Sequence, residues 1–156
     1  MIKIRVISPG KDKDRWLTEG IEHYLKLLSR YASVEFVYLP SPRLPASSPP
    51  EEIMKKEAAH FEKELKGGLV VALSERGEKF NSVAFSKFLE KIQVESRGPI
   101  SFLIGGAFGL HPGLLDRADH IVSLSDLTFS HQLVRLILAE QMYRGFSILH
   151  GTAYHK

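Results

Sequence analysis

Short apolar runs alternate along the chain with segments of helical periodicity, and this alternation restricts the possible folds more than any other feature. The runs that read as strands are 2–7, 33–39, 68–74, 100–105 and 120–125. The segments with helical spacing are 15–29, 51–66, 82–93 and 131–149, and a short helix is predicted after His111. Such alternation predicts an α/β fold, with a mainly parallel sheet and helices on both faces. A length of 156 residues fits one domain spanning 1–156.

The segment 40–50, PSPRLPASSPP, interrupts this alternation. It holds five of the chain's eight prolines. Proline removes a backbone donor and fixes φ, so we expect an exposed, irregular loop. Because strand and helix continue to alternate after it, we interpret the loop as an insertion within one fold.

The last predicted helix, 131–149, is apolar around most of its circumference. Its apolar residues include Leu133, Val134, Leu136, Ile137, Leu138, Met142, Tyr143 and Phe146. A helix that is apolar all round must be covered all round. In so short a chain we expect one of its faces to meet a second copy of the protein; the alternative is a central helix of the core.

The composition excludes several classes of protein. With 44% hydrophobic and 25% charged residues it is ordinary for a globular chain. No apolar run approaches the roughly 20 residues that span a bilayer, and the start, MIKIRVISPGK, is too quickly charged for a signal peptide. We therefore expect a cytoplasmic protein with no membrane partner. No cysteine is present and the histidines lack the spacing of metal ligands, so no metal site is expected. The net charge of +3 only weakly favours an acidic partner such as nucleic acid.

Three turns follow predicted strands, and open α/β sheets bind ligands at the carboxyl ends of their strands. They read LSERGEKF from Leu73, IGGAFGLH from Ile104 and LSDLTFSHQLVR from Leu124. The glycines of the second turn match neither GxGxxG nor GxxxxGK[ST], which excludes the dinucleotide and P-loop fingerprints. Two readings remain open: a backbone that closely approaches a flat or bulky ligand, and a tight turn without a ligand.

The third turn carries several groups that could do chemistry. Ser130 is expected to cap the following helix, and Asp126 to form the turn. A triad of these two with His131 is disfavoured, because neighbours in one loop rarely converge and no GxSxG elbow is present. Arg135, near the amino end of an apolar helix, opposes the helix dipole, so it must reach solvent or meet an anion.

The chain ends in Tyr154, His155 and Lys156. A terminus ordinarily frays, which is one reading of this tail. The other is functional: an aromatic ring, an imidazole and a cation in a row can stack on a base, move a proton and meet a phosphate.

Together these segments resemble one family. GKDKDRW, YLKLLSRY, LIGGAFG, LSDLTFSHQLVRLILAEQMYR and the terminal YHK are similar to the ribosomal RNA large subunit methyltransferase H family of the SPOUT class, over the whole chain. The resemblance implies an α/β sheet with a C-terminal trefoil knot, a homodimer and S-adenosylmethionine as cofactor. It also implies N3-methylation of pseudouridine 1915 in 23S rRNA within the assembled 70S ribosome, with no DNA partner.

The resemblance also implies roles for particular residues. Carried over by motif, the cofactor contacts fall on Leu73, Gly105, Leu124, Ser125, Asp126, Leu127, Thr128 and Phe129. We hypothesise that His155 or Tyr154 contacts the base, either in its own subunit or in the partner subunit's active site, and that Arg135 lies near a phosphate or a developing carbonyl charge. The family usually has proline where this chain has Ala153, and often where it has Ser130, so the tail is expected to be less rigid here.

Three rival functions are weighed against this one. A sister SPOUT enzyme would methylate a ribose hydroxyl of tRNA, but the tail and the lack of an added RNA-binding domain argue against it. A ribosome-binding factor without catalysis is disfavoured by the glycines and the tail. A nucleotide-binding oxidoreductase is disfavoured by the missing fingerprint.

Overall fold

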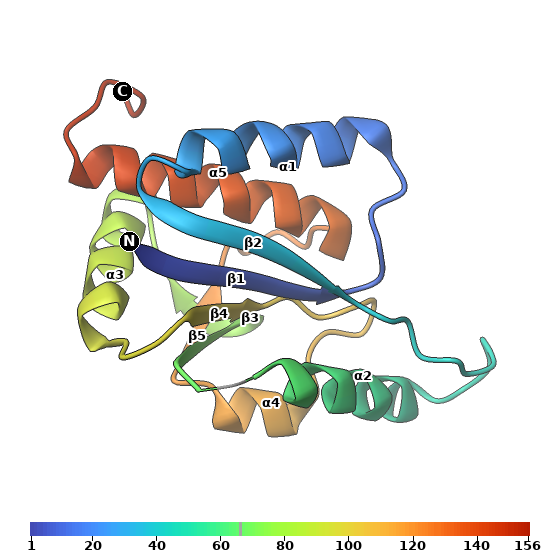
Figure 1. The fold of residues 1–156 in the computed structure, drawn as a ribbon. Coiled ribbons are helices and arrows are strands. Elements are labelled where there is room, and N and C mark those ends of the chain that lie inside the picture. The colour runs from blue at the N-terminus through green and yellow to red at the C-terminus, as the bar shows by residue number, and fades with distance from the viewer. Residues whose placement is uncertain (66) are drawn as a thin grey trace.

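The computed structural model describes residues 1–65 and 67–156, and in it a sheet lies between two layers of helices (Figure 1). The strands are β1 (Ile2–Pro9), β2 (Ala32–Leu39), β3 (Leu69–Lys79), β4 (Ile100–Leu103) and β5 (His120–Ser123). The helices are α1 (Arg15–Leu28), α2 (Pro50–Glu64), α3 (Ser82–Glu95), α4 (Pro112–Arg117) and α5 (His131–Leu149). The strand order is β2-β1-β4-β3-β5 and every strand pair is parallel, which confirms the predicted architecture.

Both faces of the sheet are covered, which explains the continuously apolar strands. In Figure 1, α1, α3 and α5 lie on one side of the sheet, and α2 and α4 on the other. All four residues of β4 are buried. Phe102 joins the core beneath the first helix layer, and its neighbour Leu103 joins the core beneath the second. Successive side chains of a strand point to opposite faces, so a strand inside three layers is covered on both faces, and three of the four β4 residues are apolar, with Ser101 the exception.

Strand β3 is longer than predicted. The segment LSERGEKF, which was expected to be a turn after the strand, lies largely within it. The strand was expected to stop at Ser74, but it continues to Lys79 with a register shift between Leu73 and Glu78, both of which pair with Val122 of β5. Gly77 makes this possible, because a Cβ there would lie 2.5 Å from the backbone of Val122. The bulge pushes the intervening residues away from the ladder and toward the end of the sheet.

The helix boundaries mostly agree with the predicted ones. Helix α5 covers 131–149 as predicted, and α2 ends at Glu64, although it was expected to reach 66; Lys66 lies outside the described residues. The cap of α3 is Asn81, whose Oδ1 accepts a hydrogen bond of 2.8 Å from the Ala84 amide. The predicted irregular loop is confirmed, with no helix or strand between β2 and α2. Among the described helices, none has the length and hydropathy needed to cross a bilayer.

Candidate functional site

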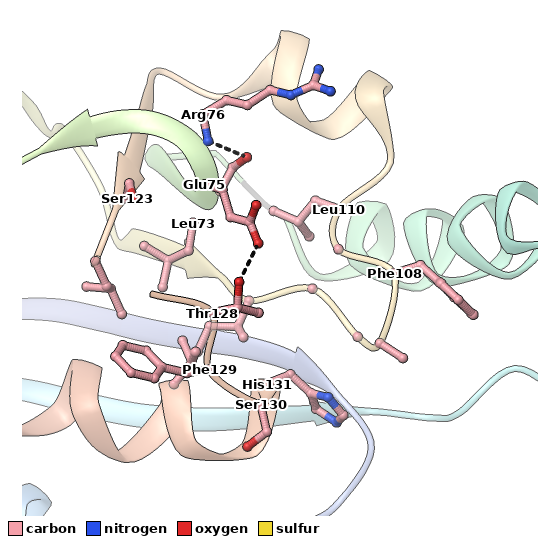
Figure 2. A pocket seen from close by; sticks show the side chains of 18 of the residues that line it. Leu73, Glu75, Arg76, Phe108, Leu110, Ser123, Thr128, Phe129, Ser130 and His131 are labelled. Atoms are coloured by element: carbon pink, nitrogen blue, oxygen red, sulfur yellow. Dashed lines mark hydrogen bonds between the residues drawn. The ribbon is translucent and has the colours of Figure 1, made fainter. Parts of the chain in front are cut away.

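A cleft of about 790 Å³ lies where β3, β4 and β5 end (Figure 2). Its walls are the bulge of β3, a glycine loop (Ile104–Leu110) and a loop before α5 (124–130). Seven of the eight residues predicted to bind the cofactor line it, namely Leu73, Gly105, Leu124, Ser125, Leu127, Thr128 and Phe129. Three segments far apart in the sequence therefore meet in one hollow, at the edge of the sheet where α/β proteins bind ligands.

The eighth residue, Asp126, does not line the cleft. Its carboxylate is exposed and forms an ion pair with Lys79 at the end of β3. This pair joins the 124–130 loop to the far side of the β3 bulge. Asp126 therefore shapes the wall of the cleft from outside.

The glycine loop folds back on itself, which is what its glycines allow. Gly109 has φ +81°, and its amide donates a hydrogen bond of 3.1 Å to the carbonyl of Gly106. A Cβ on Gly105 would lie 2.7 Å from the Cα of Gly109, so a side chain cannot fit there. A Cβ on Gly106 would lie 2.5 Å from Oε2 of Glu57, a buried carboxyl of α2 whose pKa is raised by burial.

Local hydrogen bonds hold the 124–130 loop. The Leu127 amide donates to Oγ of Ser125 at 3.0 Å, and Thr128 Oγ1 donates to Glu75 across the cleft at 3.4 Å (Figure 2). The Leu127 side chain is nevertheless 71% exposed, which leaves an apolar group uncovered at the cleft. Ser130 caps α5 as predicted, since its Oγ accepts from the Leu133 amide at 3.2 Å. With Ser130 used as a cap and Asp126 paired to Lys79, the disfavoured catalytic triad is absent.

Arg135 meets an anion, as predicted, but the anion belongs to the protein. Its side chain is fully buried and pairs with Asp12, while its guanidinium also donates to Ser8 Oγ at 2.9 and 3.0 Å. Tyr38 donates to the other oxygen of Asp12 at 2.9 Å, and the guanidinium lies 5.1 Å from the Tyr38 ring centroid. Burial and Asp12 together raise the pKa of Tyr38 to about 12. A side chain with no exposed surface does not reach a phosphate, so in this structure Arg135 is a positioning residue that fixes the first turns of α5 to the end of β1.

His131, one turn before Arg135, lines the cleft although it was not predicted as a site residue. Burial lowers the pKa of its imidazole, and the Arg135 charge lowers it further, while Asp12 raises it. The two residues share a helix face, and this spacing was the available signal for it. The same spacing could not identify Asp12, which lies 123 residues away from Arg135.

The tail follows the carboxyl end of α5 (Figure 1), whereas the cleft is lined by residues at the amino end of that helix. Tyr154 donates a hydrogen bond of 3.1 Å to Glu140, and its ring makes an edge contact with Tyr143 at 4.7 Å between centroids. Arg144 donates to Nδ1 of His155 at 3.1 Å. None of the three tail residues is among those lining the cleft of the described chain. Within one chain, the predicted catalytic groups of the tail and the predicted cofactor groups are therefore not brought together.

No group of three potential metal ligands occurs among residues 1–65 and 67–156. The polar groups at the cleft are hydroxyls, amides, one carboxylate, one guanidinium and one imidazole. This set suits an organic ligand with apolar and polar parts.

The arrangement of sheet and helices is similar to that of solved methyltransferases. A probable methyltransferase from Bordetella pertussis superposes with a TM-score of 0.59 over 92% of this chain and 94% of its own, at 13% identity. A probable methylase family protein from Haemophilus influenzae gives 0.58 over 96% of this chain and 67% of its own, at 12% identity. At such identities the likeness concerns the fold alone.

The chain is of the SPOUT methyltransferase class, because the family model described as "Predicted SPOUT methyltransferase" matches residues 2–155. Proteins named "Ribosomal RNA large subunit methyltransferase H" from Desulforamulus reducens and Acetivibrio thermocellus are 40% and 41% identical over 100% and 99% of this chain, and over the whole of their own lengths. The homologue of that name from Streptococcus gordonii is 39% identical over 99% of this chain. The chain belongs to the ribosomal RNA large subunit methyltransferase H family. The trefoil knot implied by the resemblance stays a prediction.

Proposed function

We propose that this protein transfers a methyl group from S-adenosylmethionine to N3 of pseudouridine 1915 in 23S rRNA of the assembled 70S ribosome, in the cytoplasm. The observation that carries the proposal is the meeting of three family motifs in one cleft, in a chain that matches its named relatives from end to end. The alternatives, a tRNA ribose methyltransferase and a non-catalytic ribosome-binding factor, are separated by the experiment below.

The cleft fits the proposed cofactor in size and chemistry. Its volume of about 790 Å³ is within the range of small-molecule sites and leaves space beside a nucleoside for part of a substrate base. Leu73 and Leu124 offer apolar surface for an adenine ring, and the exposed Leu127 gains a partner when the cleft is filled. The backbone amides and carbonyls of the glycine loop and of the 124–130 loop can hydrogen-bond the ring edge. No cationic phosphate site is needed, in agreement with the absent phosphate motifs.

Bound S-adenosylmethionine supplies a methyl group that its sulfonium already activates. The protein has to hold the attacking nitrogen in line with that methyl group, which accounts for much of the rate in such reactions. The N3 imide must also lose its proton, and the carbonyls beside it gain negative charge, so hydrogen-bond donors at those oxygens accelerate the step.

The tail offers donors. Because Arg144 can only donate, Nδ1 of His155 is the acceptor of their hydrogen bond, and the remaining Nε2 carries the proton in the neutral ring. Burial raises the pKa of Tyr154, and Tyr24 and Glu140 raise it further, so its hydroxyl stays protonated. Both groups therefore suit hydrogen bonds to carbonyl oxygens of the base, with the Tyr154 ring as a stacking surface.

We further propose a homodimer in which the tail of one subunit completes the cleft of the other. The tail and the cleft lie at opposite ends of α5. If the α5 helices of two copies pack antiparallel, each tail lies beside the cleft of the other copy. The outward side of α5 keeps partly exposed apolar side chains, and Trp16 at the start of the neighbouring helix α1 is 61% exposed. Burial of this apolar surface by a second copy would stabilise a dimer.

The experiment is methyl transfer from labelled S-adenosylmethionine to whole ribosomes from cells that lack this protein. Separated 23S rRNA and bulk tRNA serve as parallel substrates. We expect label on one pseudouridine of the large-subunit RNA, and only in assembled ribosomes, because a net charge of +3 provides little affinity for free RNA. Label on tRNA would favour the ribose methyltransferase. Cofactor binding without label on any substrate would contradict the proposed reaction, and no cofactor binding would favour the ribosome-binding factor.

A further inference from the structure

We propose that His131 is the general base that accepts the N3 proton of the pseudouridine. The proposal rests on the proposed function and adds to it a catalytic residue outside the tail and outside the predicted cofactor contacts. It assigns the two halves of the chemistry to two histidines, with His131 removing the proton and His155 donating to a carbonyl.

The first argument is position. His131 is the first residue of α5 and lies in the cleft with Thr128, Phe129 and Leu73 (Figure 2). It directly follows the 124–130 loop, which lines the same cleft and would hold the methyl donor. The Ser130 cap and the buried Arg135 hold the first turn of α5 from both sides of His131, and this fixes where the ring can reach.

The second argument is that its nitrogens are free. In the described part of the chain, no hydrogen bond engages either ring nitrogen of His131. By contrast, Nε2 of His111 contacts Glu51 at 3.0 Å, Nε2 of His120 contacts Glu95 at 2.8 Å, and Nδ1 of His155 accepts from Arg144. Of the imidazoles that hydrogen bonds do not occupy, His131 is the one that lines the cleft.

The third argument is charge. The groups that act on His131 are Arg135 on its own helix and Asp12 from the segment after β1, and Asp12 is already paired with Arg135. Burial and the Arg135 cation lower the pKa of the imidazole, and the positive end of the α5 dipole acts in the same direction. The ring is therefore neutral near pH 7 and has a lone pair available.

The competing base at the cleft is Glu75. It already accepts a hydrogen bond from Thr128, and a carboxylate is a much weaker base than imidazole toward an imide proton. An imidazole has a pKa near the working pH, which favours proton transfer in both directions.

The step balances without another reactant. As the N3–carbon bond forms and the carbon–sulfur bond breaks, the sulfur keeps the electron pair of that bond and the N3 proton moves to His131. The imidazolium then releases the proton to water, and its proximity to Arg135 favours that release. No oxidant, reductant or metal takes part.

The experiment compares His131→Gln with His60→Gln in single-turnover methyl transfer to ribosomes between pH 6 and 9. His60 lies on α2, outside the cleft, and serves as the matched control. We expect His131→Gln to lose roughly 100-fold or more in rate at pH 7, within the usual contribution of a general base, while its dissociation constant for S-adenosylmethionine stays close to wild type. Its rate should keep rising with pH as the imide ionises by itself, whereas the wild-type rate should level off above the His131 pKa. Added imidazole should partly restore a His131→Ala variant.

A readout independent of turnover is the His131 pKa in the protein alone, measured by NMR titration, which should lie below that of an ordinary histidine and rise in Arg135→Met. A wild-type protein that methylates no ribosome would overturn the proposed function and this role together. An active wild type, with His131→Gln matching its rate and pH profile, would overturn only the role of His131. A loss explained entirely by weaker cofactor binding would also overturn it.

Discussion

The two ends of helix α5 differ in almost every respect. At the amino end, Arg135 is completely buried and paired with Asp12, Ser130 caps the helix, and the side chains line a cleft. At the carboxyl end, Tyr154 and His155 are exposed and lie on the helix surface. The first end is built as a rigid wall, and the second carries reactive groups on a short tail without a cavity of its own.

The difference between the two helix ends supports the proposed homodimer. The helix has 19 residues, so its ends are separated by about 28 Å at 1.5 Å per residue. Seven residues follow the helix, and they cannot return to its amino end while Tyr154 stays on Glu140. This separation within one chain supports the proposed homodimer, in which a second chain supplies the tail.

The largest effect is expected at the rigid end. Asp12→Ala leaves the Arg135 guanidinium buried without its anion, which should lower the free energy of unfolding by about 3–5 kcal/mol. Asp14→Ala, two residues later at an exposed position with no capping bond, should change it by less than about 0.5 kcal/mol. Denaturant titration of both variants measures this. Equal effects would mean that the buried pair contributes nothing beyond a surface charge.

The next effect concerns the tail. A chain that ends at Ala153 lacks Tyr154, His155 and Lys156, and its methyl transfer to ribosomes should fall by about 100-fold or more, about 2.7 kcal/mol in the barrier. Its dissociation constant for S-adenosylmethionine should remain near wild type, because the tail does not line the cleft. Full activity of the shortened chain would remove the tail from the mechanism.

Mixing tests whether the tail acts across the dimer. The shortened chain and a full-length Gly105→Val chain are each expected to be inactive, since valine cannot fit against Gly109. When the two are unfolded and refolded together, mixed dimers hold one intact cleft and one intact tail facing it, so part of the activity should return. No recovery in verified mixed dimers would contradict action between subunits.

A smaller effect on cofactor affinity is expected when a glycine near each end of α5 is replaced. Gly105→Ala places a Cβ 2.7 Å from the Cα of Gly109 and should weaken S-adenosylmethionine binding by about tenfold, about 1.4 kcal/mol. Gly151→Ala, beyond the other end of α5, meets nothing within 4 Å and should leave the affinity unchanged, although its φ of +67° makes the alanine mildly strained. Calorimetric titration of each variant with the cofactor gives the comparison.

The smallest effect tests how firmly each helix end is held. Ser130→Ala removes the hydrogen bond to the Leu133 amide and should cost about 1 kcal/mol of unfolding free energy. Thr152→Ala removes a longer bond of 3.3 Å to the Ser147 carbonyl at the exposed end and should cost clearly less. A larger loss of unfolding free energy in Thr152→Ala than in Ser130→Ala would mean that the carboxyl end of α5 is the more firmly held end.

Much of the site could be predicted because it lies in continuous segments. The loop before α5 and its cap are local features, and the sequence pattern located both, with Asp126 the one predicted contact that turned outward. The β3 bulge was missed, because a strand that continues through polar residues depends on β5 beside it. His131 was missed as a site residue because nothing local distinguishes an imidazole beside a cleft from one on the surface.

The sequence by itself determined the order of strands and helices, the extent of α5 and the family, since periodicity, capping and motifs act over a few residues. Only the tertiary structure decided that Arg135 serves Asp12 and not a substrate, and that the tail is held far from the cleft of its own chain. Those facts depend on contacts such as Arg135 with Asp12, 123 residues apart, and on the length of one straight helix. Packing settles such contacts across the whole chain, and no local pattern encodes which distant groups will meet.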